Sequence, residues 1–217
     1  MKPTAFMRRI LSLLFALAVG ALAGEAPKPL FSENFEAAAV GKLPDGFKVL
    51  AGGFAVQQDG SAKFMELPGA PLDTFGVLFG PAEKAPIAAT ANIFGTKTGR
   101  KFPAFGLSVG GAGGYRLQVS AAKKMLEIFK GDEVRASVPF EWMSGTWTKL
   151  RIQVRPAGAG CLVEGKAWPA DGAEPKEWLI KLESPEPAAP GQAGVWGDPF
   201  SGTPIRFDDL VVVAGTF

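Results

Sequence analysis

The stretch from Gly145 to Arg155 places the strongest constraint on the fold, because apolar and polar residues alternate along it. Side chains of an extended strand point alternately to the two faces of a sheet. Leu150, Ile152 and Val154 therefore share one face. Trp147 and the basic residues of the stretch share the other. Such a strand has one face for a protein core and one for water or a ligand, as in antiparallel sheets.

Other segments repeat this pattern between glycine-rich turns, and no segment shows sustained helical periodicity. We expect strands over residues 30–36, 47–58, 62–67, 75–79, 87–94, 104–109, 115–119, 124–129, 134–138, 145–155, 161–168, 178–182 and 205–213. The range 47–58 is one strand or two short ones broken at Gly52-Gly53. Tight turns at Asp59-Gly60, 110–114 and 130–132 join antiparallel neighbours, because parallel strands need long crossovers. The sequence thus predicts an all-β protein, built as a two-sheet antiparallel β-sandwich.

The first 23 residues have the three parts of a secretory signal peptide. Basic residues at the start precede an apolar run over residues 10–19 and the ending Ala21-Leu22-Ala23. The apolar run is short for a membrane-spanning helix and no second run follows, although an uncleaved anchor stays the alternative. We expect export to the periplasm or the medium, and a single domain over residues 24–217.

The absence of histidine limits the chemistry more than any residue that is present. It removes Ser-His-Asp and Cys-His catalytic arrangements and the commonest zinc ligand. The one cysteine, Cys161, excludes an intramolecular disulfide, and its strand-like surroundings indicate a buried, inert thiol. Residues 1–23 hold three of the 23 Lys and Arg and none of the 21 Asp and Glu. The mature chain is therefore near neutral, with no charge that favours nucleic acid as a partner.

Short motifs lie in a recognisable order between residues 30 and 213. They are Phe31 to Glu36, Leu43-Pro-Asp-Gly-Phe47, Gly145-Thr-Trp147, Pro190-Gly-Gln-Ala-Gly-Val195 and Ile205-Arg-Phe-Asp-Asp-Leu-Val211. In these motifs the chain resembles the concanavalin A-like lectin and glucanase superfamily, particularly its laminin-G-like branch and the 3-keto-disaccharide hydrolase domains. The resemblance implies a jelly-roll β-sandwich. It implies no single activity, because this fold hosts many functions.

A polar sheet face is the candidate ligand site. Planar amides and guanidinium groups can hydrogen-bond sugar hydroxyls while an aromatic ring stacks on the sugar, a combination that suits a lectin-like surface. Side chains of this kind occupy the outward phase of their strands, and we predict as ligand contacts Trp147, Arg151, Gln153, Arg116, Gln118, Arg135 and Asn92. The alternative is a face that is only wetted by solvent, with Trp147 in a structural role.

Acidic residues near the two ends of the domain indicate a second kind of site. The terminal strands of a jelly roll often lie side by side, and proteins that this chain resembles hold a structural Ca²⁺ there through acidic and backbone oxygens. By that resemblance the predicted ligands are Glu33, Glu36 and Asp208. The alternative is that these carboxylates face solvent or make ordinary turn contacts.

We predict no catalytic residues. Glycoside hydrolysis normally needs two carboxyl groups flanking the scissile bond, and no acidic stretch of this chain shows the alternating acidic motif of the glucanases. The leading hypothesis is therefore an exported domain that binds poly- or oligosaccharide. One alternative is a sugar hydrolase of the glucanase or 3-keto-disaccharide hydrolase type. The other is a structural or protein-binding domain at the cell surface.

Overall fold

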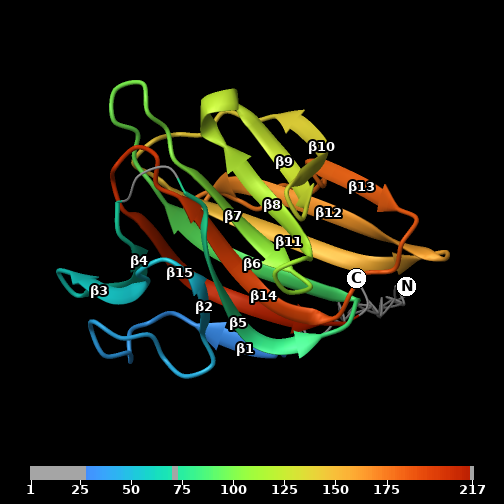
Figure 1. Ribbon diagram of the computed structural model, residues 1–217, viewed down its shortest axis with the longest axis horizontal. Coiled ribbons are helices and arrows are strands. Elements are labelled where there is room, and N and C mark those ends of the chain that lie inside the picture. The colour runs from blue at the N-terminus through green and yellow to red at the C-terminus, as the bar shows by residue number, and fades with distance from the viewer. Residues whose placement is uncertain (1–27, 70–72, 216–217) are drawn as a thin grey trace, which may run out of the picture.

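The computed structural model describes residues 28–69 and 73–215. In it, two antiparallel sheets pack face to face (Figure 1). The eight-stranded sheet contains, in spatial order, β13 (Ile180–Ser184), β12 (Gly160–Pro169), β11 (Trp147–Ala157), β6 (Ile87–Phe94), β15 (Ile205–Ala214), β4 (Ala62–Leu67) and β3 (Ala55–Asp59), with β1 (Phe31–Glu33) beside β15. The seven-stranded sheet contains β10 (Glu133–Pro139), β9 (Met125–Lys130), β8 (Tyr115–Ser120), β7 (Ala104–Val109), β14 (Gly191–Asp198), β5 (Phe75–Glu83) and β2 (Lys48–Ala51). The predicted antiparallel β-sandwich is confirmed.

Three of the predicted tight turns join neighbouring strands. The Asp59-Gly60 turn pairs β3 with β4, and Gly60 adopts a left-handed φ of 61° that favours glycine. Residues 110–114 join β7 to β8, and Gly131, with φ 59°, lies in the turn from β9 to β10. A single turn of 3₁₀ helix, η1 (Ala121–Lys123), connects β8 to β9. Local turn chemistry therefore sets the register of these hairpins.

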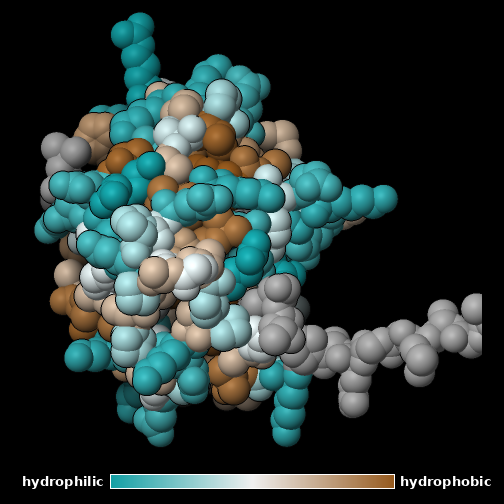
Figure 2. Space-filling model, turned by 90° about the vertical axis from the view of Figure 1, so that its right-hand side faces the viewer, coloured by the Kyte–Doolittle hydropathy of each residue, from teal (hydrophilic) through white to brown (hydrophobic). Residues whose placement is uncertain are grey.

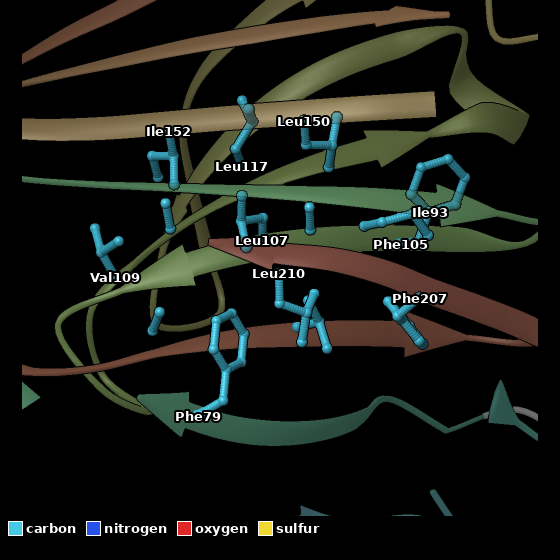
Figure 3. Packing of buried hydrophobic residues seen from close by; sticks show 14 of the residues in the cluster. Phe79, Ile93, Phe105, Leu107, Val109, Leu117, Leu150, Ile152, Phe207 and Leu210 are labelled. Carbon is cyan, nitrogen blue, oxygen red and sulfur yellow. The ribbon is translucent and has the colours of Figure 1, made fainter. Parts of the chain in front are cut away.

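The core lies between the two sheets, as Figure 3 shows for ten labelled side chains. Leu150 and Ile152 of β11 project from the eight-stranded sheet, and Leu107 and Leu117 project toward them from the seven-stranded sheet. All four are fully buried. The alternation predicted for β11 is thus confirmed on its inward face, where burial of each large apolar side chain contributes about 1.5–3 kcal/mol. Tyr115 and Cys161 are also buried, as predicted.

Several strand boundaries differ from the sequence prediction, and the reason is visible for β1 and β14. β1 ends at Glu33, three residues earlier than expected, because Phe35 adopts a left-handed φ of 59° that no strand can continue. β14 was not predicted, yet it lies between β7 and β5. Its glycines conceal it in the sequence, but the packing requires them: a Cβ on Gly194 would lie 2.8 Å from Leu78 Cδ2.

The chain changes sheet between β5 and β6 and again between β6 and β7. β1 and β15, from the two ends of the domain, pair side by side, with Glu33 opposite Leu210, as the jelly-roll resemblance implies. The predicted signal peptide, residues 1–23, lies outside the described residues.

Figure 2 shows the end of the sandwich where the β11–β12 hairpin turns. Hydrophilic residues cover most of this end, with hydrophobic residues emerging between them. Among the residues that the structure describes, no helix is long and apolar enough to cross a membrane.

Candidate functional site

A groove of about 530 Å³ lies on the outer face of the eight-stranded sheet. Strands β4, β6, β11 and β15 supply its floor, and the loop before β11 and the turn after β12 supply its walls. We call it the groove. Its lining consists of Ala62, Phe64, Asn92, Met143, Thr146, Trp147, Pro169, Ala170, Asp171 and Asp208. Its volume is that of a small-ligand site.

Aromatic side chains line one level of the groove across neighbouring strands. Trp147 of β11 lies opposite Phe94 of β6 in the ladder, with their ring centroids 5.5 Å apart. The Arg206 guanidinium of β15 lies 4.4 Å from the Phe64 ring centroid, and Glu66 holds its Nε at 3.0 Å. The rings are therefore fixed by cross-strand pairing, and the half-buried Trp147 is the aromatic surface that a ligand can reach.

Polar groups form the next level of the groove. Asn92 of β6 lies between Lys149 of β11 and Asp208 of β15 in the sheet. A bulge after Asp208, where Asp209 has a φ of 48°, brings the Asp209 carboxylate 2.7 Å from Asn92 Nδ2. Because a carboxylate only accepts hydrogen bonds, this contact fixes the amide orientation. It leaves Asn92 Oδ1 buried without a hydrogen-bond donor among the described residues.

Asp208 has the most perturbed acidity of the groove. Burial, together with the nearby carboxylates of Asp209, Glu36 and Glu33, raises the pKa of Asp208 to about 6. The backbone N–H of Asp209, 2.7 Å from Asp208 Oδ1, acts in the opposite direction. Asp208 therefore changes protonation state close to neutral pH, within a groove that also contains Asp171.

The loop between β12 and β13 covers the rest of this outer face. Glu174 of the loop lies 3.4 Å from Arg151 Nη1 and 2.9 Å from Lys166 Nζ. Trp178 lies over the same two cations, 5.8 Å from Arg151 Cζ and 4.6 Å from Lys166 Nζ. Arg151, a predicted ligand contact, therefore already pairs with this loop outside the groove.

Gln153 is also committed to internal contacts. It is 3% exposed, although it lies on the outward face of β11. Its Nε2 donates to Glu164 Oε2 at 2.7 Å, and Glu164 also pairs with Arg155 and Lys181. The alternation pattern could not reveal this buried network, because the cross-strand partners come from β12 and β13.

The seven predicted ligand contacts do not share one face, and the prediction of a single polar face is corrected here. Trp147, Arg151, Gln153 and Asn92 lie on the outer face of the eight-stranded sheet. The remaining three, Arg116, Gln118 and Arg135, belong to β8 and β10 of the seven-stranded sheet. A side chain that points away from the core of a sandwich lies on one of two opposite outer surfaces, depending on which sheet holds its strand. Alternation along a strand does not tell which sheet that is, so it cannot group residues into one site. Of the seven, Trp147 and Asn92 line the groove.

The predicted calcium ligands lie near one another, since the carboxylates of Glu33 and Glu36 help to raise the pKa of Asp208. Among the described residues, no three His, Cys, Asp or Glu side chains are arranged to hold a metal ion. Glu33 Oε1 accepts the backbone N–H of Phe35 at 2.6 Å, and Glu36 Oε1 accepts that of Lys63 at 3.2 Å. Glu33 thus makes the turn contact that was the alternative, and Glu36 makes a long-range contact to β4. Calcium binding by these residues stays a prediction.

Several groove residues carry no signal in the sequence. Phe64 is an apolar residue that is only 4% exposed, as a core residue would be. It nevertheless lies on the outer face of the sheet, beneath Arg206. Met143 and Asp171 come from loops. Only the aromatic residue at the start of β11 and the amide in β6 were identifiable from alternation.

Comparisons with known proteins match the fold and not the sequence. No protein-family model and no curated protein sequence matches the chain. A carbohydrate-binding module, CBM66, from Bacillus subtilis has a TM-score of 0.56 and 13% identity, and covers 78% of this chain and 96% of its own. The carbohydrate recognition domain of Emp46p, in its metal-free form, has a TM-score of 0.60 and 12% identity, covering 89% and 100%.

An enzyme domain is also among the similar structures. The catalytic domain of a glycoside hydrolase family 131 protein from Coprinopsis cinerea has a TM-score of 0.54 and 8% identity, covering 88% of this chain and 96% of its own. At these identities the similarity establishes the fold alone. The fold is the concanavalin A-like jelly-roll sandwich that the sequence motifs resemble.

Proposed function

We propose that this domain binds carbohydrate in the groove. The observation that carries the proposal is the combination of a half-buried indole, Trp147, with the carboxyl groups of Asp208 and Asp171 in one groove of ligand size. The apolar face of a sugar ring packs against an indole, and sugar hydroxyls donate hydrogen bonds to carboxylate oxygens. The groove presents both kinds of contact within the space of a short oligosaccharide.

Two further observations support this proposal. Domains described as carbohydrate-binding share the fold, which makes the same use of this chain reasonable by analogy. The predicted signal peptide would also carry the domain to a compartment where poly- and oligosaccharides are available.

The test is a glycan-array screen of residues 24–217, followed by titration of the best neutral oligosaccharide. Trp147→Ala removes the stacking surface, and we expect binding about fivefold or more weaker, since a buried aromatic contact contributes about 1 kcal/mol or more. Trp147→Phe, which keeps a smaller ring, should retain part of the affinity.

Arg151→Ala is the matched control. Arg151 lies on the same strand but pairs with Glu174 outside the groove, so its removal should leave affinity within about threefold. If Trp147→Ala and Arg151→Ala lose the same amount of affinity, the ligand contacts the whole outward face of β11 and not the groove alone. No binding to any glycan would contradict carbohydrate recognition.

A sugar hydrolase is the second candidate, because two carboxyl groups line the same groove. Burial raises the pKa of Asp208 to about 6, the range of a general acid, while Asp171 is exposed. Release of reducing ends from the bound oligosaccharide would support this activity only if Asp208→Asn and Asp171→Asn both abolish it. A domain that binds and never cleaves would exclude it.

A further inference from the structure

Arg116 lies on the other side of the molecule, on the outer face of the seven-stranded sheet. It is half buried between two rings, with its Cζ 4.7 Å from the Phe129 centroid and 5.2 Å from the Trp196 centroid. Phe129 lies opposite Arg116 on the neighbouring strand β9, and Trp196 belongs to β14, which is distant along the chain. We call it the Arg116 clamp.

Glycines in neighbouring strands make room for the clamp. A Cβ on Gly106 would lie 3.1 Å from Arg116 Cγ, and one on Gly76 would lie 2.6 Å from Trp196 Cε3. Both side chains therefore lie across bare backbone. Trp196 Nε1 also donates to Ser108 Oγ at 2.8 Å, which fixes the indole beside the guanidinium. The clamp is thus held in place before any ligand arrives.

The charge of Arg116 has no paired carboxylate among the described residues. Four other arginines pair with carboxylates within 4.0 Å, namely Arg135, Arg151, Arg155 and Arg206. Arg116 makes no such pair, and its Nε is buried without an acceptor. Burial lowers its pKa, and the more distant charge of Asp132 opposes this only in part. Glu127, the acid on the adjacent strand, is already held by Ser120 and Lys123.

A hollow of about 230 Å³ opens on the same face. Gln118, two residues from Arg116 on β8, forms part of its floor, and Phe200 and Asp198 form part of its wall. Asp198 Oδ1 is buried with no hydrogen-bond donor among the described residues, and burial raises the pKa of this carboxyl group. The face therefore combines a cation that has no carboxylate partner with the planar amide of Gln118, whose Nε2 donates to Ser120 Oγ at 3.1 Å. Such groups recognise an anion and hydroxyls.

We propose that the Arg116 clamp and the adjoining hollow form a second ligand site, specific for a carboxylated sugar such as a uronic acid. The planar guanidinium pairs with the sugar carboxylate through two parallel hydrogen bonds, a geometry that arginine matches and lysine does not. The Gln118 amide exchanges hydrogen bonds with the hydroxyls. The site is separate from the groove, because the two lie on opposite outer faces of the sandwich.

The test is titration of the protein with an oligogalacturonate and with its methyl ester, which keeps the sugar rings and removes the charge. We expect the acid to bind at least about tenfold more tightly than the ester, since charge-assisted pairs are about twice as strong as neutral ones. Arg116→Gln should lose about tenfold or more in affinity for the acid. Arg116→Lys, which keeps the charge without the fork, should lose less.

Controls separate this site from the groove and from misfolding. Arg135→Gln removes an exposed arginine from the same sheet and should bind the acid as the native protein does. Trp147→Ala should also bind the acid normally, even if it loses neutral oligosaccharides. Equal binding of acid and ester, no loss in Arg116→Gln, or loss in Trp147→Ala would each overturn the second site. If the protein binds the acid but no neutral sugar, only the proposal that carbohydrate binds in the groove would be overturned.

Discussion

Replacing Asp208 with asparagine gives a quantitative test of the electrostatics in the groove. Burial and three neighbouring carboxylates raise the pKa of Asp208 from 3.8 to about 6. The folded protein therefore binds this proton more tightly than the unfolded chain does. The resulting stabilisation is fully present below about pH 4 and is lost as the pH rises through about 6.

The size of the effect follows from that difference. A rise in the pKa of Asp208 from 3.8 to about 6 corresponds to a change in the free energy of unfolding of at most about 3 kcal/mol. Because Asp208 is partly exposed, we expect a change of about 1–2 kcal/mol. An asparagine at this position would stay neutral at every pH and could still accept the Asp209 N–H. The Asp208→Asn variant should thus gain about 1–2 kcal/mol relative to the native protein between about pH 4 and about pH 7.5.

The assay is urea unfolding at a series of pH values, with tryptophan fluorescence as the signal that monitors unfolding. Asp45→Asn, in an exposed turn outside the groove, is the control for replacing a carboxyl group with an amide. If the native protein and Asp208→Asn keep a constant difference across this pH range, then Asp208 is not buried as described and the groove chemistry fails with it.

Two further predictions concern packing beneath each face. Gly76→Ala should destabilise the fold by about 1–3 kcal/mol and shift the Trp196 fluorescence, because its Cβ would lie 2.6 Å from the indole, whereas Gly53→Ala, with 3.6 Å to the nearest atom, should change little. Equal unfolding free energies for these variants would contradict the packing. Glu164→Ala should cost about 2–4 kcal/mol by leaving Gln153 without its acceptor, and Glu164→Leu/Gln153→Leu should recover part of that loss in denaturant melts.

Local patterns predicted the sheets well, for identifiable reasons. The alternation around Leu150 and Ile152 reports burial directly, and Asp59-Gly60 forms a hairpin through backbone conformation alone. Where neighbours across the sheets decide the conformation, the patterns fail. β14 contains glycines because Leu78 and other side chains pack against its backbone. The residues of the segment alone do not show the alternation that predicts a strand.

The candidate functional sites were less predictable than the fold, because they depend on contacts between distant segments. Asn92 meets Asp209 across 117 positions of sequence, and both depend on the bulge in β15. Arg116 and Trp147 share an outward phase, yet the crossovers put them on opposite surfaces. The sequence identified the polar residues but could not divide them between two faces.

The central claim, that sugar binds in the groove, is tested most directly by NMR of the indole N–H groups of the five tryptophans. Titration with the neutral oligosaccharide selected on the array should shift the Trp147 indole signal strongly and saturably. The signals of Trp178 and Trp196, which lie outside the groove, should stay in place. A saturable shift at either of those residues without one at Trp147, or no shift at all, would contradict binding in the groove.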